Sequence, residues 1–229
     1  MKTIKNLMLA AICLIATSAM TSCLNSDDDS IDPTLTEEEQ TAYLTRLCGT
    51  YTGEMTYTCT IPAEDGKQLK TFRNTIKDMV WRVNSDKTIT VTNFPDSIYN
   101  NAIRGNANLE KIMENAPEKD LKCEFAPYKY KNDKGTIDYA FQLLPKTEST
   151  ESSQYAYTKN EFMVDDAKYT MQFGYALYYG GASSMGYQSK TDYTMEFQLV
   201  LADIKCTPVQ QFQTVPDLIY FKGSKGFGY

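Results

Sequence analysis

The chain contains no histidine. This removes the usual general base for a serine or cysteine nucleophile and the commonest metal ligand. Residues 182–186, Ala-Ser-Ser-Met-Gly, superficially resemble a nucleophile elbow, but they lack its first glycine and have no base to activate a serine. Two carboxylates could still hydrolyse a glycoside, yet the sequence selects no pair. We therefore expect a protein that is not an enzyme and that holds no metal or other cofactor.

Adjacent carboxylates at Asp165 and Asp166 illustrate why no acid pair is selected. On a strand, neighbouring side chains point to opposite faces and cannot share one substrate. A turn that exposes both carboxylates to solvent explains them better.

Tyrosine is the residue type that could form a binding surface, since the chain has 17 tyrosines. Four of them surround a Gly-Gly loop beside an expected strand end: Tyr175, Tyr178, Tyr179 and Tyr187. Such rings can stack on a glycan or line a pocket for a small apolar ligand, while their hydroxyls bond polar groups. The alternative is that they are ordinary half-buried strand residues. We take these four tyrosines as the candidate ligand-binding site, and the lone Trp81 as a core residue.

The cysteines leave two interpretations open. Besides Cys23, the cysteines expected to survive processing are Cys48, Cys59, Cys123 and Cys206. Their wide spacing fits no compact zinc motif. In an oxidising compartment they could form disulfides, in any of three pairings, or they could be buried thiols.

The N-terminus has the pattern of a secretion signal. Lys2 and Lys5 precede an apolar run over residues 7–19, which is too short to span a bilayer. The following Met-Thr-Ser-Cys, residues 20–23, resembles the lipobox cut by the lipoprotein signal peptidase. We therefore predict a signal peptide over residues 1–22 and a lipid anchor on Cys23 that holds the chain at a membrane. The alternative is an ordinary cleaved signal that releases a soluble domain.

Residues 23–35 form an expected acidic tether, because Asp27, Asp28 and Asp29 repel one another and keep it extended. An acidic run directly after the acylated cysteine resembles the surface-export signal of lipoproteins from Bacteroides-type bacteria. We therefore expect the chain at the outer membrane, and two alternatives stay open for the acidic run: a signal for export to the cell surface, or a simple solvated linker. The net charge of −6 makes nucleic acid an unfavourable partner.

The remaining residues, 36–229, are expected to form a single β-rich domain. Thr36 and Glu39 have the spacing of a capping box, and Gly49 offers a stop, so a short helix is expected first. Alternation of period two then predicts strands, and apolar spacings of three and four predict a helical insertion. The strands are expected at 51–60, 72–83, 88–93, 121–131, 137–143, 171–179 and 193–199, the helical insertion at 98–116, and a frayed tail at 223–229. Polar turns predict that 72–83 and 88–93 form one hairpin and 121–131 and 137–143 another, and the last two strands should pair.

Two short motifs carry a resemblance to a known architecture. Gly49-Thr50-Tyr51-Thr52-Gly53 opens the first strand, and residues 90–95, Thr-Val-Thr-Asn-Phe-Pro, precede the helical insertion. Both look like segments of the calycin-like β-barrel lipoproteins of Bacteroides-type bacteria. The resemblance implies a mainly β protein, an antiparallel calycin/lipocalin-like barrel or barrel-like sandwich with a short N-terminal helix and one helical insertion.

The expected function is that of a cell-envelope lipoprotein that binds a small molecule or glycan in the mouth of such a barrel. The alternative is a protein-interaction or structural subunit of an outer-membrane complex. A histidine-free enzyme is the least favoured.

Overall fold

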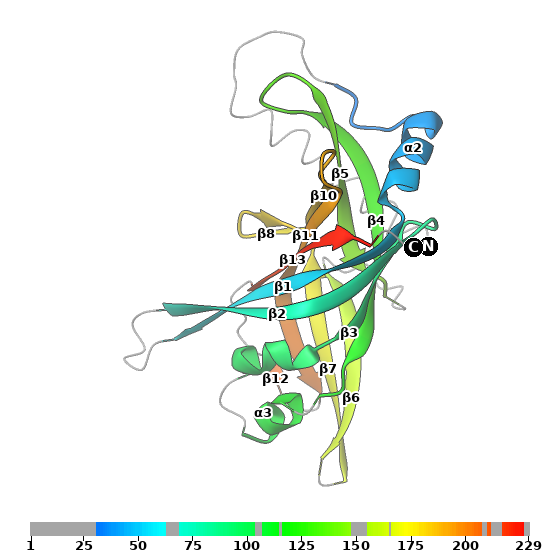
Figure 1. The fold of residues 1–229 in the computed structure, drawn as a ribbon. Coiled ribbons are helices and arrows are strands. Elements are labelled where there is room, and N and C mark those ends of the chain that lie inside the picture. The colour runs from blue at the N-terminus through cyan, green and yellow to red at the C-terminus, as the bar shows by residue number, and fades with distance from the viewer. Residues whose placement is uncertain are drawn as a thin grey trace.

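The computed structural model describes residues 31–62, 69–103, 107–114, 116–147, 155–164, 166–207, 210–211 and 217–226. The predicted signal peptide and Cys23 lie outside these residues. The described chain is mainly β, with antiparallel strands and few helices, as the alternation in the sequence predicts (Figure 1).

Eight of the described strands form a hydrogen-bonded ring. Its order is β1, β2, β3, β4, β5, β10, β11, β13 and back to β1. Their bounds are β1 Gly49–Pro62, β2 Leu69–Asn84, β3 Thr88–Phe94, β4 Lys119–Lys131, β5 Ile137–Pro145, β10 Met185–Gln188, β11 Thr194–Thr207 and β13 Asp217–Lys225. The predicted hairpins β2–β3 and β4–β5 are confirmed.

A branch leaves the ring at the second half of β11. Residues Val200 to Thr207 pair with β7, Ala167–Ala176, which pairs in turn with β6, Ala156–Val164. The short β12, Gln210–Gln211, also pairs with β11. A separate hairpin of β8, Tyr178–Tyr179, and β9, Ala182–Ser183, lies beside β11. Figure 1 shows it projecting from the side of the sheet.

Two sequence expectations about these strands are wrong. The tail was expected to fray, but Gly223 to Lys225 belong to β13, which lies between β1 and β11. The second is wrong only in the residues that meet: the strands expected at 171–179 and 193–199 do pair, as β7 and β11, but β11 continues to Thr207 and β7 pairs with this second half. The first half of β11 pairs with β10 and β13 instead.

The N-terminal helix α2, Glu37–Leu47, begins at the predicted capping box. The Thr36 hydroxyl accepts from the Glu39 amide at 3.2 Å, and the Glu39 carboxylate accepts from the Thr36 amide at 2.8 Å. The helix buries Tyr43 and Leu47 against the ring. Lys129 on β4 forms an ion pair with Glu39, 2.9 Å, so the cap also fastens the helix to the sheet.

Replacing Thr36 with alanine should lower the free energy of unfolding by about 1 kcal/mol, because one helix amide loses its acceptor. Chemical denaturation measures this. Thr41→Ala, in the exposed interior of the same helix, should cost nothing and is the matched control. Equal losses in both variants would show that the cap adds no stability.

Aromatic side chains fill the interior of the ring. Trp81 is completely buried, as predicted, and stacks on Tyr51 with 5.9 Å between ring centroids. Its edge contacts come from Phe197 and Phe221, and its indole N–H donates to the sulfur of Met195 at 3.4 Å. These contacts leave the centre of the ring packed with side chains.

The predicted helical insertion is confirmed between β3 and β4. It consists of the 3-10 helix η1, Asp96–Ile103, and the helix α3, Ala107–Glu114. Tyr99 of η1 is buried and stacks on Phe173 with 4.4 Å between centroids. In Figure 1, α2 lies near one end of the molecule and α3 near the other. The insertion therefore packs into the core and extends it toward β7.

Candidate functional site

A shallow polar groove of about 490 Å³ lies on the outside of the ring, over strands β1, β2, β11 and β13. Its lining carries both signs of charge, from Glu54 and Asp78 and from Lys77 and Lys222. The remaining lining residues are Thr52, Gly53, Thr194, Gly223 and Ser224.

A β-bulge shapes one wall of the groove. Gly53 pairs with Met79 and Met55 with Ile76, so Lys77 and Asp78 on β2 together oppose Glu54 on β1. Asp78 has a positive φ of 60° at this irregularity. The bulge gives β2 one extra residue at this point, so that Lys77 and Asp78 both line the groove.

Two glycines form the floor of the groove. Gly53 and Gly223 are direct partners across β1 and β13. A Cβ on Gly223 would lie 2.4 Å from Cη2 of Trp81 and 2.5 Å from the Thr52 carbonyl oxygen. The indole ring of Trp81 therefore occupies the space beneath Gly223. Because neither Gly53 nor Gly223 has a side chain that could push β1 and β13 apart, the two strands stay close and the groove stays shallow.

A hydrogen-bonded cluster of Tyr187, Glu196, Tyr220 and Lys222, the rim cluster, adjoins the groove through Lys222. The Glu196 carboxylate accepts from the Tyr187 hydroxyl at 2.6 Å and from the Tyr220 hydroxyl, and pairs with Lys222 at 3.0 Å. Partial burial acts to raise the pKa of Glu196, but these three partners together lower it below its ordinary value. The bond to Glu196 raises the pKa of Tyr187 to about 12. The rim thus presents rings held in place by an ionised carboxylate.

A second tyrosine cluster lies further along β11. The Tyr157 hydroxyl donates to Asp203 at 2.5 Å and accepts from Lys205 at 2.7 Å, and the Lys205 ammonium lies 4.4 Å from the Tyr157 ring centroid. Tyr155 makes edge contacts with the rings of Tyr157 and Tyr179. The β8–β9 hairpin lies between the two clusters, where Gln198 donates to the Ser183 carbonyl at 2.8 Å. Tyrosines from nearby strands therefore contact the outer face of β11 at both of its ends.

The structure does not bring the four predicted tyrosines together. Tyr175 is completely buried and its hydroxyl bonds that of Tyr99, so it belongs to the core and not to a ligand site. Tyr178 is 61% exposed at the hairpin, Tyr179 joins the second cluster, and Tyr187 joins the rim cluster. The prediction assumed one strand through Tyr179, but β7 ends at Ala176, and this separates Tyr175 from the others.

Sequence reasoning missed Tyr220, Glu196 and Lys222. The alternation of Ile219, Tyr220, Phe221 and Lys222 is a strand signal that could have found two of them. It was overlooked because the last expected strand ended at 199 and the expected frayed tail began at 223, so residues 200–222 were assigned no element.

Two residue types considered for chemistry have structural roles. Ser184 is buried, donates to the Ala176 carbonyl at 2.6 Å and accepts from the Val200 amide at 2.9 Å, so it joins strands. Cys48 and Cys123 are free thiols, and burial raises the pKa of each. The side chain of Cys59 lies outside the described residues. Within the described part of the chain, no three side chains of the metal-binding types lie close enough to hold a metal ion.

The described residues thus define a mainly antiparallel β protein with a hydrogen-bonded ring, a filled interior and a polar groove on its outer face. Residues 46–206, the greater part of the chain, match a family described as a domain of unknown function, DUF4840, and the chain belongs to this family. No curated protein and no solved structure matches it. Among the helices that the structure describes, none is long and apolar enough to cross a membrane.

Proposed function

We propose that this chain is a cell-envelope lipoprotein with a calycin-like barrel, anchored through Cys23 at the outer membrane, that binds a glycan along the outer face of β11 and β13. The observation that carries the proposal is the groove bordered by the rim cluster. The expected site in the barrel mouth is replaced by one on the outside, because the interior is packed with aromatic rings.

The chemistry of the groove suits a sugar chain. Sugar hydroxyls need donors and acceptors together, and Glu54, Asp78 and Lys77 provide both. The apolar face of a sugar ring packs on an aromatic ring whose hydroxyl is already satisfied, as those of Tyr187 and Tyr220 are. Glu196 and Lys205 are about 30 Å apart along β11, at about 3.3 Å per residue. A face of this length favours an oligosaccharide over a single sugar.

The proposed anchor follows from the order of segments along the chain. The apolar run, the Met-Thr-Ser-Cys motif and the acidic tether precede α2 directly. Acylation of Cys23 would place the folded domain at the end of a short, extended and negatively charged tether.

Binding is tested with the mature chain, purified in mild detergent, against a panel of neutral and acidic polysaccharides. Tyr187→Leu combined with Tyr220→Leu should weaken binding about tenfold or more, because two ring contacts of about 0.5–1.5 kcal/mol each are lost. Isothermal titration calorimetry measures the affinity. Phe72→Leu, which removes an exposed aromatic ring of β2 that does not line the groove, is the matched control. Equal affinity in the double variant and in the wild type would contradict the proposed groove site.

The filled interior favours a second candidate, a protein-interaction subunit of an outer-membrane complex. In that case no polysaccharide binds, and the chain extracted in mild detergent sediments as part of a larger complex. Tyr187→Arg combined with Tyr220→Arg should then release it.

A further inference from the structure

We propose that a second site, between α2 and β5, binds an organic carboxylate through the guanidinium of Arg46. This carboxylate pocket has a volume of about 390 Å³ and is independent of the groove. Its lining residues are Glu38, Glu39, Ala42, Tyr43 and Arg46 from α2 and Tyr139 from β5.

Arg46 lacks partners for two of its nitrogens. Nε and Nη2 are both buried, and neither has a hydrogen-bond partner in the described structure. The guanidinium lies over the Tyr43 ring, 5.3 Å from its centroid, so one face is covered while the N–H edge remains unbonded. Adjacent Nε–H and Nη2–H groups match the two oxygens of a carboxylate, and an unsatisfied buried cation is costly.

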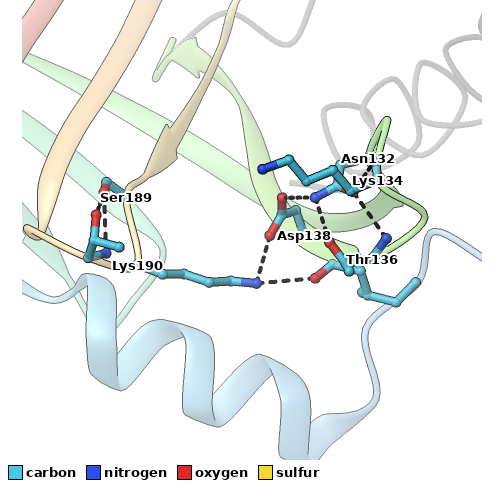
Figure 2. A network of polar contacts seen from close by, with 8 residues as sticks. Asn132, Lys134, Thr136, Asp138, Ser189 and Lys190 are labelled. Carbon is cyan, nitrogen blue, oxygen red and sulfur yellow. Dashed lines mark hydrogen bonds and ion pairs between the residues drawn. The ribbon is translucent and has the colours of Figure 1, made fainter.

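Two neighbouring carboxylates are already engaged. Glu39 accepts from Lys129 at 2.9 and 3.0 Å and from the Thr36 amide at 2.8 Å. Figure 2 shows Lys190 extending from its loop to Asp138, with which it pairs at 2.6 Å, while Asn132 donates to the other oxygen at 2.7 Å. These partners hold the pKa of Asp138 below its ordinary value. Neither acid is free to pair with Arg46.

Tyr139, which is partly exposed, provides a surface for the body of the ligand, and the buried Tyr43 supports it from below. Tyr43 and Tyr139 stack with 5.5 Å between centroids, and the Lys190 ammonium lies 5.7 Å from the Tyr139 centroid on β5. The pairs Glu39–Lys129 and Asp138–Lys190 each join opposite charges in direct contact. Arg46 has no such contact within the described residues, although its charge also helps to lower the pKa of Asp138. Glu38 lines the pocket at the other end of the helix face. A carboxylate attached to a ring or chain that packs on tyrosine fits this arrangement.

Such a carboxylate could belong to an acidic sugar or to the end of a peptide, and matched probes separate these sources. The probes are galacturonate with galactose as its neutral counterpart, and N-acetyl-phenylalanine with its neutral amide. The full mature chain is titrated in detergent while the Arg46 Nε–H resonance is followed by NMR. Both acids, or one of them, should shift this resonance saturably, and the neutral counterparts should not.

Arg46→Met keeps the aliphatic stem and should weaken binding of the responding acid on the order of tenfold or more. Arg82→Met, which removes an exposed arginine of β2, should leave it unchanged. Arg46→Lys retains the charge without the paired N–H groups and should be intermediate, which covers the case in which Arg46→Met does not fold. The proposal is overturned if no acid moves the Nε–H resonance, or if a folded Arg46 variant binds as the wild type does.

Discussion

Replacing Trp81 with alanine is expected to lower the free energy of unfolding by about 3–5 kcal/mol, the largest loss expected for a single side chain in this fold. The indole is completely buried and contacts rings from three other strands, through Tyr51, Phe197 and Phe221. It also lies against Gly223, which has no side chain to move into the space. The cavity would therefore remain open.

Val80→Ala is the matched control, because Val80 is the preceding residue of β2 and is 36% exposed on the opposite face. It should change the free energy of unfolding by well under 1 kcal/mol. Urea denaturation followed by far-ultraviolet circular dichroism gives both values. A loss at Trp81 no larger than that at Val80 would mean that the ring interior is not the stabilising core.

Folding stability is expected to fall as pH rises through the titration of Asp96. Burial raises the pKa of this carboxyl to about 6 from an ordinary 3.8, against the lowering effects of the Asn160 hydrogen bond and of Lys119. Asn160 donates to Asp96 and accepts from Lys119 at 2.6 Å, so the carboxyl is fixed between η1 and β6.

The direction of this pH effect depends on whether the folded or the unfolded chain holds the Asp96 proton. Between about pH 4 and pH 6 the folded chain keeps Asp96 protonated while the unfolded chain has lost the proton, so rising pH favours unfolding. The stabilisation is complete below the unfolded pKa and lost above the folded one, and it amounts to about 3 kcal/mol. Urea denaturation at several pH values measures it.

Asp96→Asn cannot ionise and should flatten this part of the profile. Asp133→Asn, in the exposed β4–β5 turn, should leave the wild-type profile unchanged. Parallel profiles for Asp96→Asn and the wild type would show that another group carries the pH dependence.

Local patterns predicted most of the elements. The capping box of α2, the β2–β3 and β4–β5 hairpins and the helical insertion all depend on residues close in sequence, whose periodicity and turn chemistry are visible. The ring depends on contacts between distant residues, such as β1 with β13 and β5 with β10. No local pattern specifies these pairs.

The candidate site was predicted less well, because its residues also come together through contacts between distant parts of the chain. Tyr187 was found from its sequence neighbours, but its partner Tyr220 is 33 residues away and reaches Glu196 only through strand pairing. Tyr175 was assigned to the wrong group because β7 ends at Ala176. The strand does not continue to Tyr179, so Tyr175 does not share a face with the other predicted tyrosines. The groove itself results from a bulge and a glycine pair that no single segment reveals.

The position of β13 between β1 and β11 has a consequence for the order in which the molecule can assemble. During synthesis the first strand emerges long before residues 217–225, so its second edge has no partner until the last strand arrives. Pairings this distant in sequence slow folding. A chain that ends after Cys206 would carry two open sheet edges at β1 and β11, and would be prone to self-association.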